Sequence, residues 1–204
     1  MANTANSGII KFRFNLKMSS PINEEHFLPI EKWRIIFHKM NLIGEYKTTN
    51  VGFGNLSKRL LVGEEPFVIT GTQTGHYPNL NGMQYCKVTK CNMTKLIIEA
   101  VGPIAPSSES LTHHAVYSKN PKINFVFHIH HIQLWNYMLK NKFPNTPEDI
   151  DHRSQAMIEA AKKCTQENEV GIFAISSSEG SVIAYGKNAE DAGKLILETL
   201  KKSR

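Results

Sequence analysis

Apolar residues at helical spacing define the first long segment of the chain. Over residues 24–42 they follow the i, i+3, i+4, i+7 pattern of one helix face. These residues are Trp33, Ile36, Phe37 and Met40. Residues 151–167 and 189–202 are expected to form two further helices, and Asn188 would cap the last of them.

A fourth helix is expected where two prolines precede a polar stretch. Pro103 and Pro106 are followed by SSESLTHHAVYSKN, in which Ser107 or Ser108 would cap the helix. This helix would end near Lys119.

Short apolar runs separated by glycine and polar turns indicate strands. The segments are 50–61, 66–71, 84–91, 95–102, 123–130, 170–176 and 181–186. Residues 123–130, INFVFHIH, are too apolar for an edge strand and belong inside a sheet. The expected fold class is therefore α/β, with helices covering a largely antiparallel or mixed sheet.

The length of 204 residues allows one good-sized core but is short for two domains. We expect residues 1–22 to form a loose arm or an edge strand, and residues 23–204 to form the domain. No stretch approaches the roughly 20 apolar residues that span a bilayer, so no membrane contact is expected. The opening MANTANSGIIKFRFNLKMSS lacks the apolar block of a signal peptide, which favours a cytoplasmic protein.

The net charge is +6, but the basic residues are scattered. Their densest clusters lie at 57–59 and 201–204, and no nucleic-acid-binding module accompanies them. A nucleic-acid partner is therefore not expected. A basic surface does suit small phosphorylated or carboxylated ligands.

Three cysteines are present: Cys86, Cys91 and Cys164. Their odd number and wide spacing argue against a disulfide framework. Without a CxxC pair a thiolate zinc site is not expected either, so these cysteines are predicted to be free and mostly buried.

Three histidines stand at the end of the apolar segment 123–130. Residues i and i+2 of a strand face the same side, so His128 and His130 point together while His131 points the other way. Such a pair can supply two imidazole ligands to zinc, iron, nickel or copper. It can equally be two hydrogen-bonded histidines, because a metal site needs a third and usually a fourth ligand.

A carboxylate is available for the same site. Glu109 lies at the expected start of a helix and could reach a metal or act as a general base. Four motifs then stand in order: GNLSKR at 54–59, TG within ITGTQTG at 69–75, PSSESLTHHAVYSKNP at 106–121 and NFVFHIH at 124–130. In this order and spacing the chain resembles the class II aldolase/adducin family of metal-dependent sugar-phosphate aldolases and epimerases, including fuculose-phosphate aldolase. The likeness runs from about residue 28 to 202.

The resemblance implies an αβα sandwich with a central, largely antiparallel sheet, assembled as a cyclic homotetramer with active sites between subunits. It implies that Glu109 is the acid/base carboxylate and that His128 and His130 hold a divalent metal, most commonly zinc, which Glu109 also binds when no substrate is present. The implied substrate-phosphate residues are Gly54, Asn55, Thr74, Gly75, Ser107 and Ser108. Backbone N–H groups of glycine turns and of a helix N-terminus, with small hydroxyls, would form this anion cradle. His113 matches a helix histidine of the family, with a structural role.

One metal-binding position of the family carries no histidine here. The family's third metal histidine lies in a late turn between two strands, where this chain reads ISSSEGSVIAYG. Glu179 takes its place in one alignment and Ser177 in another, and His152 is a further alternative. A glutamate oxygen can bind zinc, whereas serine is a poor ligand. The C-terminal tail is short compared with family enzymes that keep a catalytic tyrosine there, so no catalytic tyrosine can be placed.

The leading hypothesis is a divalent-metal-dependent lyase of the aldolase type, or an isomerase, acting on a small phosphorylated sugar. The metal would stabilise an enediolate, and Glu109 would move the proton. Two alternatives stay open: a non-catalytic, adducin-head-like module for binding or assembly with a degraded metal site, and a dehydratase of the thiosugar-salvage type. The missing histidine favours the module, whereas the presence of Glu109, His128 and His130 opposes it.

Overall fold

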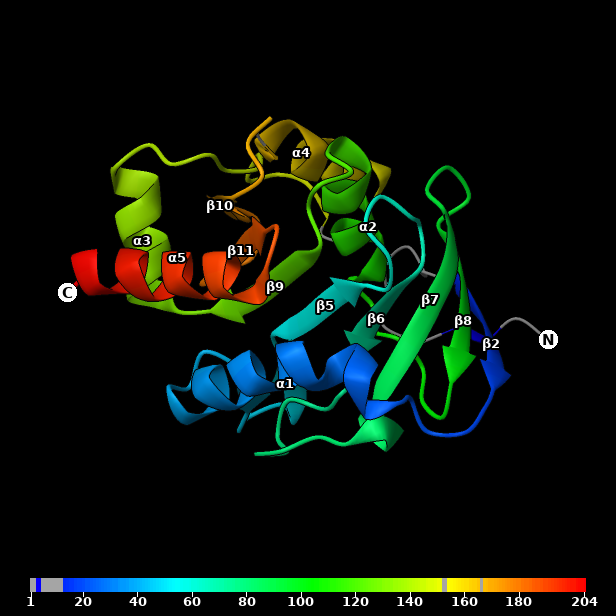
Figure 1. Ribbon diagram of the computed structural model, residues 1–204. Coiled ribbons are helices and arrows are strands. Elements are labelled where there is room, and N and C mark those ends of the chain that lie inside the picture. Colours follow the sequence, from blue (N-terminus) through cyan, green and yellow to red (C-terminus); the bar gives the residue numbers. More distant parts are fainter. Residues whose placement is uncertain (1–2, 5–12, 152–153, 166) are drawn as a thin grey trace.

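A mixed β-sheet forms the centre of the computed structural model, which describes residues 3–4, 13–151, 154–165 and 167–204 (Figure 1). Nine strands within these residues make the sheet, in the spatial order β1-β2-β8-β7-β6-β5-β9-β11-β10. Their bounds are β1 Asn3–Thr4, β2 Arg13–Met18, β5 Asn55–Arg59, β6 Phe67–Thr70, β7 Tyr85–Asn92, β8 Ile97–Gly102, β9 Phe125–His130, β10 Gly171–Ala174 and β11 Ser181–Gly186. A separate hairpin consists of β3 Gly44–Tyr46 and β4 Val51–Phe53. Neighbouring strands of the large sheet are antiparallel, except that β2 and β8 are parallel.

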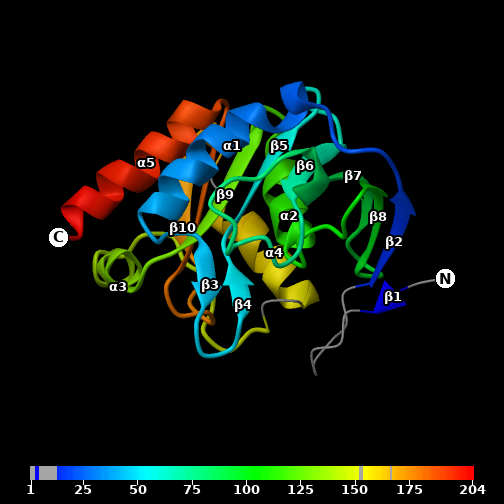
Figure 2. The same cartoon turned by 90° about the horizontal axis from the view of Figure 1, so that it is seen from below.

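Helices cover both faces of the sheet and give the molecule three layers (Figures 1 and 2). Their bounds are α1 Glu24–Lys39, α2 Ser110–Lys119, α3 Ile132–Lys140, α4 Gln155–Cys164 and α5 Ala189–Lys202, with a short 3₁₀ turn at Gly82–Gln84. Helices α1, α3 and α5 pack on one face, and α2 and α4 pack on the other. No helix in the described part of the chain is long and apolar enough to cross a membrane. The predicted αβα sandwich with a largely antiparallel sheet is confirmed.

The alternation of side chains along β9 divides the interior into two apolar cores. Phe127 and Ile129 belong to the core beneath α1, α3 and α5, whereas Val126 belongs to the core beneath α2 and α4. His128 and His130 alternate in step with Val126 and therefore face the side of α2. Strand β9 lies between β5 and β11, so its predicted interior position is also confirmed.

The expected cap of α2 is wrong. Glu109, rather than Ser107 or Ser108, is the N-cap residue, and its side chain makes no capping hydrogen bond. Its carboxylate instead turns toward Asn55 and His128 on the sheet. Ser107 lies just before the helix, where its Oγ accepts a hydrogen bond from the backbone N–H of Glu109 at 3.3 Å.

Helix α3 has no counterpart among the elements predicted from the sequence. It begins directly after β9, because His131 is its N-cap and the ring Nδ1 accepts a hydrogen bond from the backbone of Leu134 at 3.1 Å. A strand that passes into a helix without glycine or proline between them lacks the usual sequence signal of a boundary. Residues 50–61, predicted as short strands broken by glycine, are indeed divided into β4 and β5 at Gly54, whose φ is +78°. Within the predicted arm, residues 13–18 form β2, which pairs with β8.

A buried polar network ties α1 to the segment that follows β6. The carboxylate of Glu31 accepts hydrogen bonds from Arg34 Nε at 2.9 Å, from the Tyr85 hydroxyl at 2.6 Å and from the backbone of Leu80 at 2.8 Å. Arg34 Nη2 in turn donates to the carbonyl of Tyr77 at 2.7 Å. Glu31 is 5 % exposed and Arg34 is 1 % exposed, so each charge depends on the other.

Removing one partner of this buried pair should destabilise the protein strongly. We expect Glu31→Ala to lower the free energy of unfolding by about 3–5 kcal/mol, because it leaves the Arg34 guanidinium buried without its counter-charge. Urea denaturation measures this change. Lys32→Ala is the matched control on the exposed side of α1 and should stay within about 0.5 kcal/mol of the unaltered protein. Equal stability of the two variants would contradict the role of the network.

Candidate active site

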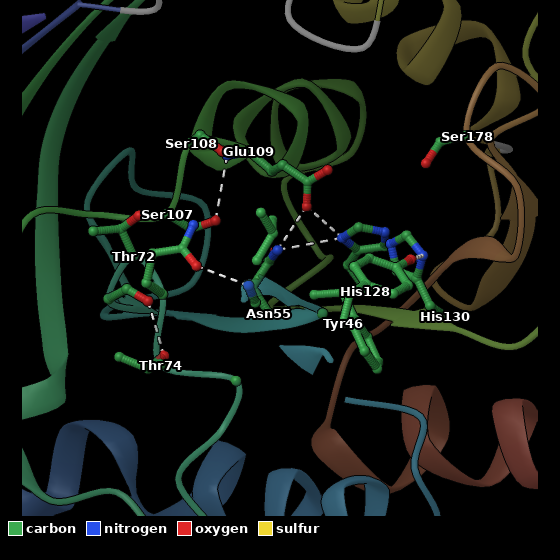
Figure 3. A pocket seen from close by; sticks show the side chains of 17 residues that line it. Tyr46, Asn55, Thr72, Thr74, Ser107, Ser108, Glu109, His128, His130 and Ser178 are labelled. Carbon is green, nitrogen blue, oxygen red and sulfur yellow. Dashed lines mark hydrogen bonds and ion pairs between the residues drawn. The ribbon is translucent and has the colours of Figure 1, made fainter. Parts of the chain in front are cut away.

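A pocket of about 190 Å³ opens where the end of β9 meets the start of α2, the β3–β4 hairpin and the loop 71–75 (Figure 3). Nine of the predicted site residues line it: Gly54, Asn55, Thr74, Gly75, Ser107, Ser108, Glu109, His128 and His130. Within the described residues Glu179 does not line the pocket, although its neighbour Ser178 does. The fold thus brings the residues of four separate motifs together at one end of the sheet.

Glu109 is held in place by two partners from the sheet. Its Oε2 accepts a hydrogen bond from Asn55 Nδ2 at 2.6 Å and contacts Nδ1 of His128. Asn55 and His128 are register partners on β5 and β9, so both reach Oε2 from neighbouring strands. Asn55 follows Gly54, where a Cβ atom would lie 2.6 Å from the Ile43 side chain, so glycine is required at this turn.

These partners keep the carboxyl group of Glu109 ionised. Burial alone would raise its pKa, but the charge of His128 and the hydrogen bonds from His128 and Asn55 outweigh burial and hold the pKa well below its usual range. The side chain is 19 % exposed. No donor in the described part of the chain reaches Oε1, so this oxygen can interact with a ligand in the pocket.

Both ring nitrogens of His128 have partners within the protein. Nδ1 contacts the Glu109 carboxylate, and Nε2 lies 2.7 Å from Oγ of Ser181, the first residue of β11. His128 is 2 % exposed and Ser181 is 1 % exposed, so water does not compete for this contact. The Ser181 hydroxyl can either donate a hydrogen bond to Nε2 or accept one from it.

His130 connects the pocket to the β3–β4 hairpin. Its ring lies beside His128, with 4.8 Å between the centroids, and its Nδ1 is 2.9 Å from the hydroxyl of Tyr46. Burial and the neighbouring His128 lower the pKa of His130 to about 3, so its ring is neutral near pH 7. Burial and the charges of Glu109 and Glu179 raise the pKa of Tyr46. This side of the pocket therefore presents a neutral hydrogen-bonded pair.

Small hydroxyl groups line the end of the pocket away from His130 (Figure 3). The Thr74 hydroxyl already donates to the carbonyl of Gly71 at 2.8 Å, and Ser107 Oγ accepts from the backbone of Glu109 at 3.3 Å. Thr72 and Ser108 also line the pocket, and among the described residues neither hydroxyl has a hydrogen-bond partner. These two hydroxyls are therefore better placed than that of Thr74 to donate to an anion.

The donor atoms do not form a complete metal site. Among the described residues no group of three His, Cys, Asp or Glu side chains could hold an ion. Of the expected third ligands, Glu179 is exposed, Ser177 Oγ is buried without a hydrogen-bond partner in the described chain, and His152 lies outside the described residues. Each ring nitrogen of His128 already contacts a protein group, so an ion bound at either one would have to displace or share that contact. The arrangement therefore does not fit the zinc ion expected from the sequence.

His113 occupies a position that favours a structural role. Its ring is fully buried, and Nδ1 lies 2.7 Å from Ser57 Oγ, which also contacts the Tyr117 hydroxyl at 2.7 Å. Burial and the neighbouring His128 lower the pKa of His113 to about 3. This contact joins α2 to β5 beneath the pocket.

Sequence reasoning did not single out Tyr46, Thr72 or Ser181. Tyr46 lies in the hairpin sequence EYKTTN, which has no periodic pattern. Thr72 stands within the ITGTQTG segment, in which the motif pointed to Thr74 and Gly75 and not to Thr72. Ser181 did leave a signal, because it is a polar residue in the otherwise apolar strand SVIAYG. Its partner could not be identified without the register between β9 and β11.

The family to which this chain belongs is the Class II Aldolase and Adducin N-terminal domain family, whose model matches residues 35–203. The resemblance drawn from the four sequence motifs is thus confirmed. No curated protein sequence matches the chain significantly.

Solved structures with the same fold include three with aldolase-type names. YgbL from Escherichia coli, provisionally an aldolase/epimerase/decarboxylase, has a TM-score of 0.66 and 17 % identity over 89 % of this chain and 88 % of its own. An L-fuculose 1-phosphate aldolase has a TM-score of 0.66 and 14 % identity over 90 % of this chain and 84 % of its own. A sugar-phosphate aldolase from Thermotoga maritima has a TM-score of 0.60 and 16 % identity, with coverages of 89 % and 97 %. Because these sequence identities are low, the likeness establishes a shared fold alone.

The unpaired hydroxyls lead to a prediction about anion binding. We expect Thr72→Ala and Ser108→Ala each to weaken the binding of inorganic phosphate by about 1 kcal/mol, the contribution of one neutral hydrogen bond. Isothermal titration calorimetry measures the affinity. Ser178→Ala, which changes a hydroxyl on the opposite side of the same pocket, is the control and should leave the affinity unchanged. Unaltered affinity in the Thr72→Ala/Ser108→Ala double variant would remove these hydroxyls from the anion site.

Proposed function

We propose that the protein catalyses proton transfer next to the carbonyl group of a small phosphorylated sugar, as an aldolase or epimerase does. The observation that carries this proposal is Glu109: an ionised, largely buried carboxylate that lines the pocket, with one oxygen fixed by Asn55 and His128 and the other reached by no donor among the described residues. A positioned carboxylate of this kind serves as a general base. Family membership supports an aldolase- or epimerase-like activity in broad terms.

The substrate would lie across the pocket with its phosphate at the hydroxyl-lined end. Thr72, Ser107 and Ser108 would donate to the phosphate there, together with backbone N–H groups of the turns at Gly54 and Gly75. Holding the remote phosphate fixes the position of the reacting carbons beside Glu109, and this orientation lowers the barrier. The net charge of +6 would favour the approach of an anionic substrate.

Glu109 would receive the proton at Oε1 while Asn55 and His128 continue to hold Oε2. The proton leaves a hydroxyl group when a carbon–carbon bond is cleaved, or a carbon next to the carbonyl when the sugar is epimerised. The low pKa keeps Glu109 unprotonated, so it can accept a proton. A bound substrate that excludes water would raise this pKa toward that of an effective general base. The neutral Tyr46–His130 pair could hydrogen-bond the oxygen on which negative charge develops.

No step of this proposal is assigned to the zinc ion implied by the resemblance, because the described donor atoms do not fit one. The incomplete ligand set of the described residues also fits the adducin-head-like alternative, but the ionised Glu109 in the pocket favours the catalytic proposal. The alternative would become the better account if Glu109 proved irrelevant to turnover. A cytoplasmic location likewise remains an expectation from the sequence.

Glu109→Gln should abolish most of the proton transfer while leaving the pocket intact. We expect turnover to fall by about 10²- to 10⁴-fold, the usual contribution of a general base, because the amide cannot accept the proton. The measurement is deuterium incorporation from solvent into a panel of aldose and ketose phosphates, followed by NMR. Glu179→Gln, which changes an exposed carboxylate on the nearby turn, is the control. Comparable exchange by Glu109→Gln and the unaltered protein would contradict the proposal.

We also propose that the protein assembles as a homotetramer, as the resemblance implies. Tyr46 and Val51 on the β3–β4 hairpin are 43 % and 45 % exposed at the rim of the pocket, which leaves apolar surface beside the site. Light scattering in dilute buffer should therefore give the mass of four subunits. A monomer would contradict an active site shared between subunits.

A further inference from the structure

We infer that this site has no resident metal and that Ser181 occupies Nε2, the one ring nitrogen of His128 that the carboxylate of Glu109 leaves open. The inference concerns the protein's own side chains and holds whichever substrate the pocket accepts. Two features of the site support the absence of a metal. Each ring nitrogen of His128 already contacts a protein group, and the described residues supply no third ligand.

His128 is completely engaged by protein groups. Nδ1 contacts the carboxylate of Glu109, and Nε2 lies 2.7 Å from the hydroxyl of Ser181. A metal ion at Nε2 would have to displace this hydroxyl. Since Ser181 is only 1 % exposed, its displaced hydroxyl could not turn to bulk water, and losing this contact would be costly.

The turn that precedes β11 does not supply the missing ligand. Glu179 is exposed and lies outside the set of described residues that line the pocket. Ser177 and Ser178 have hydroxyl groups, which are poor ligands for zinc compared with histidine, cysteine or carboxylate. Among the described residues no group of three histidine, cysteine or carboxylate side chains is placed to hold an ion, and this includes Glu109 with His128 and His130.

The same contacts give Ser181 a positioning role. Hydrogen bonds and an ion pair run from Ser181 to His128, to Glu109 and on to Asn55, and so connect β11, β9, the start of α2 and β5. The order serine, histidine, carboxylate is that of a nucleophilic triad. Ser181, however, is almost fully buried and is absent from the described lining of the pocket, so it cannot attack a substrate there. Ser181 holds the His128 ring in the orientation in which the ring contacts the carboxylate of Glu109.

Cobalt(II) provides the probe, because its visible absorption reports coordination by protein ligands. The unaltered protein should contain no stoichiometric metal after purification and dialysis. Added Co²⁺ should produce no ligand-field band and no rise in melting temperature. Stoichiometric metal that survives dialysis, or saturable Co²⁺ binding by the unaltered protein, would overturn the inference.

Variants at two positions test the part played by Ser181. Glu179→His supplies a third imidazole on the turn but leaves Nε2 of His128 occupied. The Glu179→His/Ser181→Ala double variant supplies the ligand and frees the nitrogen, so it should bind Co²⁺ about tenfold more tightly, or better, than Glu179→His alone. Equal affinity of these two variants, or failure of a folded double variant to bind Co²⁺ at all, would overturn the role given to Ser181.

Two further variants separate this role from a general loosening of the turn. Glu179→His/Ser181→Thr keeps a hydroxyl at the same position and should behave like Glu179→His alone. Glu179→His/Ser178→Ala removes a neighbouring hydroxyl that does not touch His128 in the described structure and should also leave the affinity of Glu179→His unchanged. Tight Co²⁺ binding by either variant would show that the hydroxyl of Ser181 does not control access to His128. Circular dichroism confirms that each variant is folded. Because the readout is metal binding, a failed proposal for the catalytic activity would not alter the result.

Discussion

The contact between the carboxylate of Glu109 and the ring of His128 is the constraint on which the site depends. An ionised carboxylate that is largely buried requires partners, because an isolated buried charge is costly. Asn55 and His128 provide these partners from adjacent strands, and Ser181 completes the hydrogen bonding of the histidine from a third strand. The non-capping start of α2 and the glycine turn before Asn55 both follow from the need to bring these groups together.

The fold places this network at one end of the sheet, beside the pocket. The apolar residues of β9 divide between two cores, and the strand changes from apolar to histidine only at its end, where the helix layer leaves room for a pocket. The buried Glu31–Arg34 pair binds the backbone of Tyr77 and Leu80. These two residues follow the loop 71–75, which forms the hydroxyl-lined wall of the pocket. Rigid strands thus hold the carboxylate, while loops supply the groups proposed to bind the phosphate.

Periodicity and motif order were sufficient for the fold, the family and the gathering of Glu109, His128 and His130 in one pocket. Helix α3 was not predicted because the strand ends at His130 and the very next residue, His131, caps the helix, with no glycine or proline to mark the boundary. The cap of α2 was misassigned because the helix begins at Ser110, later than the serine pattern suggested, and Glu109 rather than a serine stands at the N-cap. The expected metal site could not be judged from the sequence for the same reason. Ser181 is the register partner of His130, and only the folded structure shows that its hydroxyl reaches the ring of His128, two residues earlier on the same face of β9.

The central claim is that protein groups, rather than an ion, complete the environment of His128. Anomalous diffraction from crystals soaked in zinc, recorded on both sides of the zinc absorption edge, tests it most directly. The account predicts no anomalous peak within bonding distance of His128 and a Ser181 hydroxyl in hydrogen-bond contact with Nε2. A peak about 2.0–2.1 Å from Nε2, the usual zinc–nitrogen distance, with Ser181 turned away, would contradict it.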